Sequence, residues 1–291
     1  MKIALAFIVA LTGFCQAATP PAQQQEMRPV SAQLLADAAS VRPGQTFTAG
    51  VLLKMGPEWH VYWKNPGDSG IPVQIELTGP DGAKVGEMRW PVPVDFIQPG
   101  EIVGYGYTDT VLFPIEVTAP AGAAPGSSLA LGARVSWLAC MDVCIPGRAT
   151  LDLAVPVAAE SAPANAPLFA EWSAKLPGET SSVAKAVESA PLEAGAKTGT
   201  VRVALDWKTP PKRVEFFPGA DPALAVSNVR VAGEGGRTVV SFDAEIFEGQ
   251  SPSSDHLESL VVVTDASGAR RGAWLPVRLR ATDTKVKGAG L

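Results

Sequence analysis

The chain has 291 residues, which is enough for two domains of ordinary size. Charged residues make up 18%, below the roughly 25% of typical soluble proteins, and the formal net charge is −5. This mildly acidic balance argues against a phosphate-binding surface, so we expect no nucleic-acid partner. The high numbers of glycine (28) and proline (26) indicate many short strands joined by turns.

The N-terminus predicts export. Lys2 precedes an apolar stretch from Ile3 to Phe14, and the small residues Ala17 and Ala18 follow. This is the pattern of a secretory signal peptide, which we expect at residues 1–18. No later apolar run approaches the roughly 20 residues of a membrane span, so the mature chain is expected to be soluble and not membrane-spanning.

The following residues alternate between apolar and other side chains in short runs, as half-buried strands do. We expect strands at Gln45–Lys54, His60–Trp63, Val73–Leu77, Lys84–Trp90, Val111–Val117, Leu129–Leu138 and Ala149–Val155. Turn-forming residues separate these runs. His60 lies in an aromatic strand, where we expect it to be packed or hydrogen-bonded rather than catalytic. Seven or more short strands predict an immunoglobulin-like β-sandwich over residues 28–157.

An Ala- and Pro-rich segment at residues 158–167 is predicted to be an interdomain linker, and residues 168–285 a second β-rich sandwich domain. Short helices are expected at its start, over Leu168–Leu176 and Ser181–Ser189. Strands are expected at Thr200–Lys208 and Arg213–Phe217. Two hairpins should follow, one turning at residues 233–236 and the other at 265–268. The fold class is therefore all-β, with two sandwich domains. This second part has no cysteine or tyrosine, so the chemistry is expected in the first.

Two cysteines remain once Cys15 leaves with the signal peptide, namely Cys140 and Cys144. They lie between two alternating runs, where one strand is followed by the next. Residues four apart in a straight strand are about 13 Å apart, whereas a disulfide needs Cα atoms about 4.4–6.8 Å apart. The backbone must therefore turn between the cysteines, and Pro146-Gly147 predicts a bend directly after them.

Two interpretations of this pair compete. A purely structural disulfide is common in exported proteins, but closing so short a loop stabilises a fold by only about 2 kcal/mol, against about 4.7 for a loop of about 100 residues. A pair on a surface turn is also open to an attacking thiolate. We therefore favour redox exchange through Cys140 and Cys144. Asp142 disfavours a nearby thiolate and Arg148 favours one, so the sequence leaves open which cysteine attacks.

Metal binding is the alternative from another class of function. Cys140, Met141 and Cys144 are soft ligands suited to Cu(I), so the alternative is a copper-handling or partner-docking module whose disulfide is only structural. A zinc site lacks four ligands at suitable spacing. No phosphate-binding glycine loop follows a strand, so no nucleotide is indicated. We expect neither a resident metal nor another cofactor.

Four motifs in this order resemble one family: residues 59–70 (WHVYWKNPGDSG), 90–93 (WPVP), 104–107 (GYGY) and 137–147 (WLACMDVCIPG). This is the periplasmic N-terminal domain of the thiol:disulfide interchange protein DsbD, especially its ScsB-like branch. The resemblance implies an immunoglobulin-like domain in the periplasm. It also implies that Cys140 and Cys144 take electrons from a membrane-embedded thiol reductase and pass them to thioredoxin-like proteins, which would make the chain a protein-disulfide oxidoreductase.

In the family an aromatic cap loop shields the pair until a partner docks. Our hypothesis gives that role to the region Ile102–Tyr107, with Tyr105 and Tyr107; the alternative is that these tyrosines only pack at the edge of the sandwich. We expect Trp137 and Pro146 to complete the surroundings of the pair. Fewer residues separate the cysteines here than in the best-known member, so its detailed geometry does not carry over. The sequence has no multi-span segment and no C-terminal thioredoxin-like domain, so the reductant is expected to be a separate protein.

Overall fold

The computed structural model describes residues 29–193, 195–233 and 235–280. The expected signal peptide at residues 1–18 lies outside this part of the chain. In the described residues, no helix has the length and apolar character needed to cross a membrane.

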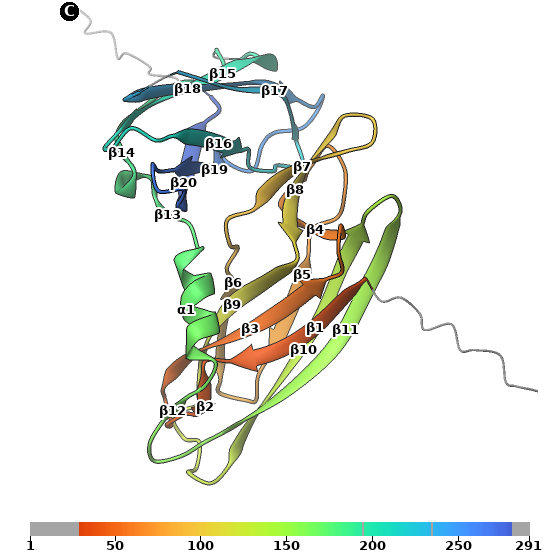
Figure 1. Cartoon of the computed structure of the whole chain (residues 1–291), viewed down its shortest axis with the longest axis vertical. Helices are drawn as coiled ribbons and strands as arrows, with labels where there is room; N and C mark the ends of the chain where they lie inside the picture. Colours follow the sequence, from red (N-terminus) through yellow and green to blue (C-terminus); the bar gives the residue numbers. More distant parts are fainter. Residues whose placement is uncertain (1–28, 194, 234, 281–291) are drawn as a thin grey trace, which may run out of the picture.

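The strands of the first part are β1 (Val30–Ala36), β2 (Ala38–Ser40), β3 (Thr46–Met55), β4 (His60–Gly67), β5 (Gln74–Thr78), β6 (Lys84–Met88), β7 (Val94–Gln98), β8 (Ile102–Thr108), β9 (Thr110–Thr118), β10 (Ser128–Cys140), β11 (Cys144–Pro156) and β12 (Ala162–Pro163). One sheet has the order β1-β3-β9-β6, and the other β11-β10-β4-β8-β7 with β5 beside β10. Their ladders are antiparallel. They form the immunoglobulin-like sandwich that the sequence predicts (Figure 1).

Alternation along β10 shows why these residues form a sandwich. Its odd-numbered residues from Leu129 to Ala139 are buried between the sheets, whereas Arg134 and Ser128 lie on the outer face. Period-two alternation is what places one face of a strand in a core and the other toward water. Strands β1, β7 and β8 were not predicted. In β8 the two glycines of the Gly-Tyr-Gly-Tyr motif weaken the apolar signal.

Helix α1 (Ala166–Ala174) confirms the first expected helix. It packs on the first sandwich through Phe169 and Trp172, which are buried in that core. The preceding β12 pairs with β2, so this part of the expected linker also lies against the first sandwich. The second expected helix, over Ser181–Ser189, is wrong: after the short 3-10 turn η1 (Thr180–Ser182) the chain forms a strand. Pairing with a neighbouring strand here overrides the helical propensity of an Ala- and Lys-containing segment.

The second part contains β13 (Gly178–Glu179), β14 (Ala184–Ala190), β15 (Thr198–Trp207), β16 (Arg213–Phe217), β17 (Leu224–Ala232), β18 (Arg237–Ile246), β19 (His256–Thr264) and β20 (Arg270–Arg278). Its sheets have the orders β13-β20-β19-β16 and β14-β15-β18-β17. The hairpins β17–β18 and β19–β20 turn where the sequence predicts. The exact domain bounds stay a prediction.

Strand β4 joins the two sandwiches, which are stacked along the long axis of the molecule (Figure 1). The Trp63 ring is fully buried and stacks on Trp274 with 6.3 Å between ring centroids. Lys64 Nζ lies 4.0 Å from the centre of the Trp274 ring and 2.6 Å from Glu258 Oε2. The Asn65 amide donates to the carbonyl of Pro218 at 2.9 Å. Residues 63–65 of the family-like motif thus hold the second sandwich on the first.

Candidate redox site

The cysteine pair closes the β10–β11 hairpin. Cys140 and Cys144 are the last paired residues of that ladder, and a three-residue loop connects them. Their Cα atoms are 4.1 Å apart and their sulfurs are bonded. The expected turn between the cysteines is confirmed. The bend expected at Pro146-Gly147 is wrong, because both residues continue β11. Proline is tolerated there because β11 is the edge strand of its sheet.

The two sulfurs differ in their access to solvent. Cys140 is 0% exposed, whereas Cys144 is an exposed residue. The cause is the strand order: Cys144 begins the edge strand β11, while Cys140 ends β10, which has β11 on one side and β4 on the other. Cys144 is thus the more exposed residue of the pair.

His60 lies directly beside the pair. It faces Cys140 across the β10–β4 ladder, so both side chains lie on the same face of the sheet as Cys144. The Gln98 amide nitrogen lies 2.8 Å from His60 Nε2 and donates to the Tyr62 hydroxyl at 2.7 Å. The expectation that His60 is packed and hydrogen-bonded is confirmed. Its place beside Cys140 was not predicted, since no local signal pairs residues so far apart in sequence.

Phe96 covers this group. Its ring centroid is 4.1 Å from that of His60. The ring lies across Gly104 on the neighbouring strand, where a Cβ would come within 2.2 Å of it. Glycine at this position therefore leaves the space through which Phe96 reaches His60. The β7–β8 hairpin supplies both Phe96 and Gln98, and the sequence interpretation missed both.

The structure does not bring Tyr105 and Tyr107 to the cysteine pair. They lie in strand β8, not in a loop, and they alternate with Gly104 and Gly106, so they point to the opposite face. Tyr107 donates its hydroxyl to the Pro91 carbonyl at 2.8 Å inside the core. Tyr105 packs edge-on against Phe217 of the second sandwich. The cap assigned to these tyrosines is therefore corrected: the aromatic side chains on the cysteine face are Tyr62 and Phe96, which pack with His60.

The other expected neighbours are divided between the two faces. Pro146 pairs with Leu138 and lies on the same face of the sheet as the cysteines. Pro146, Leu138 and Ile71 line a hollow of about 560 Å³. Trp137 is on the core face, with its ring over Gly147. Met141 packs partly buried against the core. Within the described residues, no group of three or more His, Cys, Asp or Glu side chains is arranged to hold a metal ion.

Burial lowers the pKa of His60 below its ordinary value of 6.5. The side chains around it are those of Thr108 on β8, Phe96 and Gln98 on β7, and the disulfide on β10, and none of them is charged. Tyr62, whose pKa burial raises, is neutral as well. His60 is therefore neutral at pH 7, in agreement with an Nε2 atom that accepts from Gln98.

This gives a pH dependence of stability. As the pH falls through 6.5, His60 becomes protonated in the unfolded chain, whereas in the folded chain its lowered pKa keeps it neutral to a lower pH. The unfolded chain then binds more protons, so the free energy of unfolding decreases as the pH falls below about 6.5. Urea unfolding at several pH values between about 7.5 and about 5 should show a shallower loss for His60→Gln than for the unaltered protein. His256 is exposed and remains in both proteins. Equal pH slopes would show that His60 is not held neutral.

Comparisons with known proteins agree with this geometry. Residues 29–156 match the family described as "Thiol:disulfide interchange protein DsbD, N-terminal". The crystal structure of the N-terminal periplasmic domain of ScsB from Proteus mirabilis is similar over 85% of this chain and 94% of that chain, with 20% sequence identity and a TM-score of 0.62. At that identity it shows the shared fold alone. The BcpA major pilin subunit of Bacillus cereus aligns over 86% of this chain and 69% of that chain at 11% identity, but its TM-score of 0.23 carries no argument. The search of curated proteins gives no match.

Proposed function

We propose, from the premise that residues 29–156 belong to the family of DsbD N-terminal domains, that the chain passes electrons between proteins in the periplasm. The family makes this part of the chain a thiol–disulfide interchange module with one cysteine pair. The proposed donor is a membrane-embedded thiol reductase, and the proposed acceptors are thioredoxin-like proteins. The observation that carries the proposal is the disulfide itself, with one exposed and one buried sulfur at the end of a hairpin.

The burial difference supports a different role for each cysteine. A thiolate of the donor attacks the Cys144 sulfur, the bond to Cys140 breaks, and Cys140 leaves as a thiolate. The second donor thiolate then attacks the donor sulfur of the mixed disulfide and releases Cys144. The donor is oxidised to a disulfide, and the pair gains two electrons and, once both thiolates are protonated, two protons. In this proposal His60, which pairs with Cys140 across the β10–β4 ladder, exchanges a proton with the buried sulfur.

The onward step runs in the opposite direction. The Cys144 thiolate attacks a client disulfide, and Cys140 then attacks Cys144 to release the reduced client. Val143 and Ile145 flank Cys144 in the sequence and are 60% and 40% exposed, and Ile71, which is 54% exposed, lines the hollow beside Pro146. Scattered apolar side chains are ordinary on a surface, but a group beside a reactive sulfur favours a protein partner.

Phe96 supplies the shielding in this proposal. It covers His60 from the β7–β8 hairpin, and movement of that hairpin would uncover the Cys140 side of the bond. Single-cysteine variants test the proposal, because Cys144 alone should retain the ability to form mixed disulfides.

A further inference from the structure

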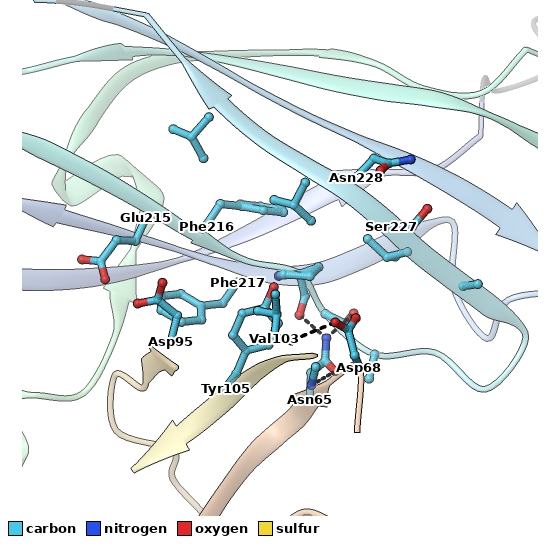
Figure 2. A pocket seen from close by; sticks show the side chains of 18 of the residues that line it. Asn65, Asp68, Asp95, Val103, Tyr105, Glu215, Phe216, Phe217, Ser227 and Asn228 are labelled. Carbon is cyan, nitrogen blue, oxygen red and sulfur yellow. Dashed lines mark hydrogen bonds between the residues drawn. The ribbon is translucent and has the colours of Figure 1, made fainter. Parts of the chain in front are cut away.

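The junction of the two sandwiches contains a cleft separate from the cysteine pair. Its volume is about 730 Å³, and it lies between β16 and β17 of the second sandwich and the ends of β4, β7 and β8 of the first (Figure 2). Phe216 and Phe217 provide apolar surface. The cleft is on the side of β8 opposite to Phe96 and His60. Disulfide exchange uses none of its residues.

Tyr105 points a free polar group into this cleft. Its side chain rises from β8 toward β16, with Asp95 on one side and Asp68 on the other (Figure 2). The residue is only 8% exposed, yet its hydroxyl makes no hydrogen bond with any residue that the structure describes. Burial, with the charges of Asp68 and Asp95, raises the pKa of Tyr105 to about 12. The hydroxyl is thus protonated at neutral pH and available to a ligand.

The charge of the lining is predominantly negative. Four carboxylates line the cleft, those of Asp68, Asp95, Glu215 and Asp221, with Arg213 as the one guanidinium. Arg270 pairs with Glu215 at 3.0 Å, and Arg213 is 3.9 Å from Asp95. Asp68 accepts from the Val103 N–H at 2.9 Å but has no ion pair with a described residue. A cationic group would therefore find an uncompensated carboxylate next to a free hydroxyl.

The shape of the cleft favours an extended chain. Both β16 and β17 are terminal strands of their sheets in the described structure. Such strands present backbone N–H and C=O groups to which a peptide can add. Residues 224–229 of β17 line the cleft, and a bulge between Ser227 and Arg230 limits the pairing to a short stretch. A small amine ligand could bind to the carboxylates but could not pair with these backbone groups, so the cleft fits a peptide better than a small amine.

We propose that this cleft binds an extended peptide segment of a partner protein, with a lysine or arginine side chain directed to Asp68 and Tyr105. Backbone pairing to an edge strand supplies general affinity, and the cationic side chain supplies selectivity. The second sandwich thereby becomes a recognition element for basic segments, in addition to its contact with the first sandwich. This inference goes beyond the redox function and does not depend on it.

The test uses titration calorimetry with the full chain. The probe is an acetylated, amidated peptide of alternating valine and threonine with one central lysine, and the control replaces lysine with norleucine. We expect the lysine peptide to bind with a Kd of about 0.1 mM. The norleucine peptide should bind about tenfold more weakly, because a charge-assisted hydrogen bond is lost.

Three variants locate the site. Asp68→Asn keeps an acceptor for Val103 N–H but removes the charge, and should weaken lysine-peptide binding about tenfold. Tyr105→Phe removes only the hydroxyl and should weaken it about threefold. Asp81→Asn, an equal charge change in the β5–β6 turn outside the cleft, should have no effect. The proposal is overturned by absence of saturable binding, by equal affinity for both peptides, by an unaffected Asp68→Asn protein, or by N-acetyl-lysine methylamide binding as tightly as the peptide.

Discussion

Replacing Cys140 with serine is expected to turn the protein into a trap for disulfide partners. In protein produced without residues 1–18, and hence without Cys15, the remaining Cys144 thiol is exposed and can attack a partner disulfide, but no second cysteine is present to resolve the product. The reciprocal Cys144→Ser protein keeps only Cys140, which is 0% exposed. We expect mixed disulfides with Cys140→Ser to exceed those with Cys144→Ser by at least about tenfold, because thiol reactivity requires access.

Two measurements distinguish the accessibility of each cysteine thiol from the recognition of protein partners. Glutathione disulfide is a small probe, and intact-mass spectrometry of each variant reports whether the cysteine has reacted. Acid-quenched periplasmic extracts on non-reducing gels then report protein partners. Equal labelling of both variants would refute the assignment of Cys144 as the attacked sulfur. Labelling of neither would remove support for exchange altogether.

Trp63→Ala is expected to cost about 3–5 kcal/mol in the free energy of unfolding, the range for removing a large buried aromatic side chain. Trp63 is fully buried and belongs to a core cluster that includes Phe217, Leu260 and Val262 of the second sandwich. Its ring stacks on Trp274 and meets Phe217 edge-on at 6.1 Å. The alanine variant therefore leaves a cavity at the junction of the two sandwiches, and urea unfolding measures the loss.

Trp63→Phe is the matched control. It keeps an aromatic ring and removes the Trp63 Nε1–H, which is buried and has no hydrogen-bond partner in the described structure. Because an unpaired buried donor itself costs about 1–3 kcal/mol, its removal offsets part of the lost packing. We expect Trp63→Phe to be destabilised by less than half as much as Trp63→Ala. A loss below about 1 kcal/mol for Trp63→Ala would mean that Trp63 does not anchor the junction.

The local sequence pattern was sufficient to predict the main features of the β10–β11 hairpin that carries the cysteines. Alternation before and after the cysteines indicated two strands, and their spacing required a turn between them. Alternation also places Tyr105 and Tyr107 on the face opposite to Gly104 and Gly106. It does not reveal which of these faces carries the cysteines, and the tyrosines were assigned to the wrong one. Which face of β8 lies on the cysteine side depends on the strands that pair with β8, and strand pairing is not encoded in the local sequence.

The surroundings of the pair were not predictable from sequence for the same reason. His60 meets Cys140 only because β4 pairs with the last residues of β10. Phe96 reaches His60 only because β8 brings Gly104 between them. The burial difference between the sulfurs follows from β11 being an edge strand. The strand at Ala184–Ala190, expected as a helix, likewise depends on its pairing with β15.

Strand β4 contributes residues to both the cysteine site and the junction of the two sandwiches. Its residues His60 and Tyr62 lie on the cysteine face, while Trp63, Lys64 and Asn65 hold the second sandwich. The same run of residues that resembles the family motif thus contributes to both the redox site and the junction. Destabilisation at the junction is expected to reach the cysteine site through this strand.

The reduction potential of the Cys140–Cys144 pair distinguishes an exchanging disulfide from a purely structural one. Equilibration with a reduced thioredoxin-like protein, followed by alkylation of free thiols, measures it. We predict a value less negative than about −300 mV and full exchange with that protein, because an accessible bond closing a short loop is readily opened. A value below about −300 mV, with the pair still oxidised, would mean that the disulfide only stabilises the hairpin.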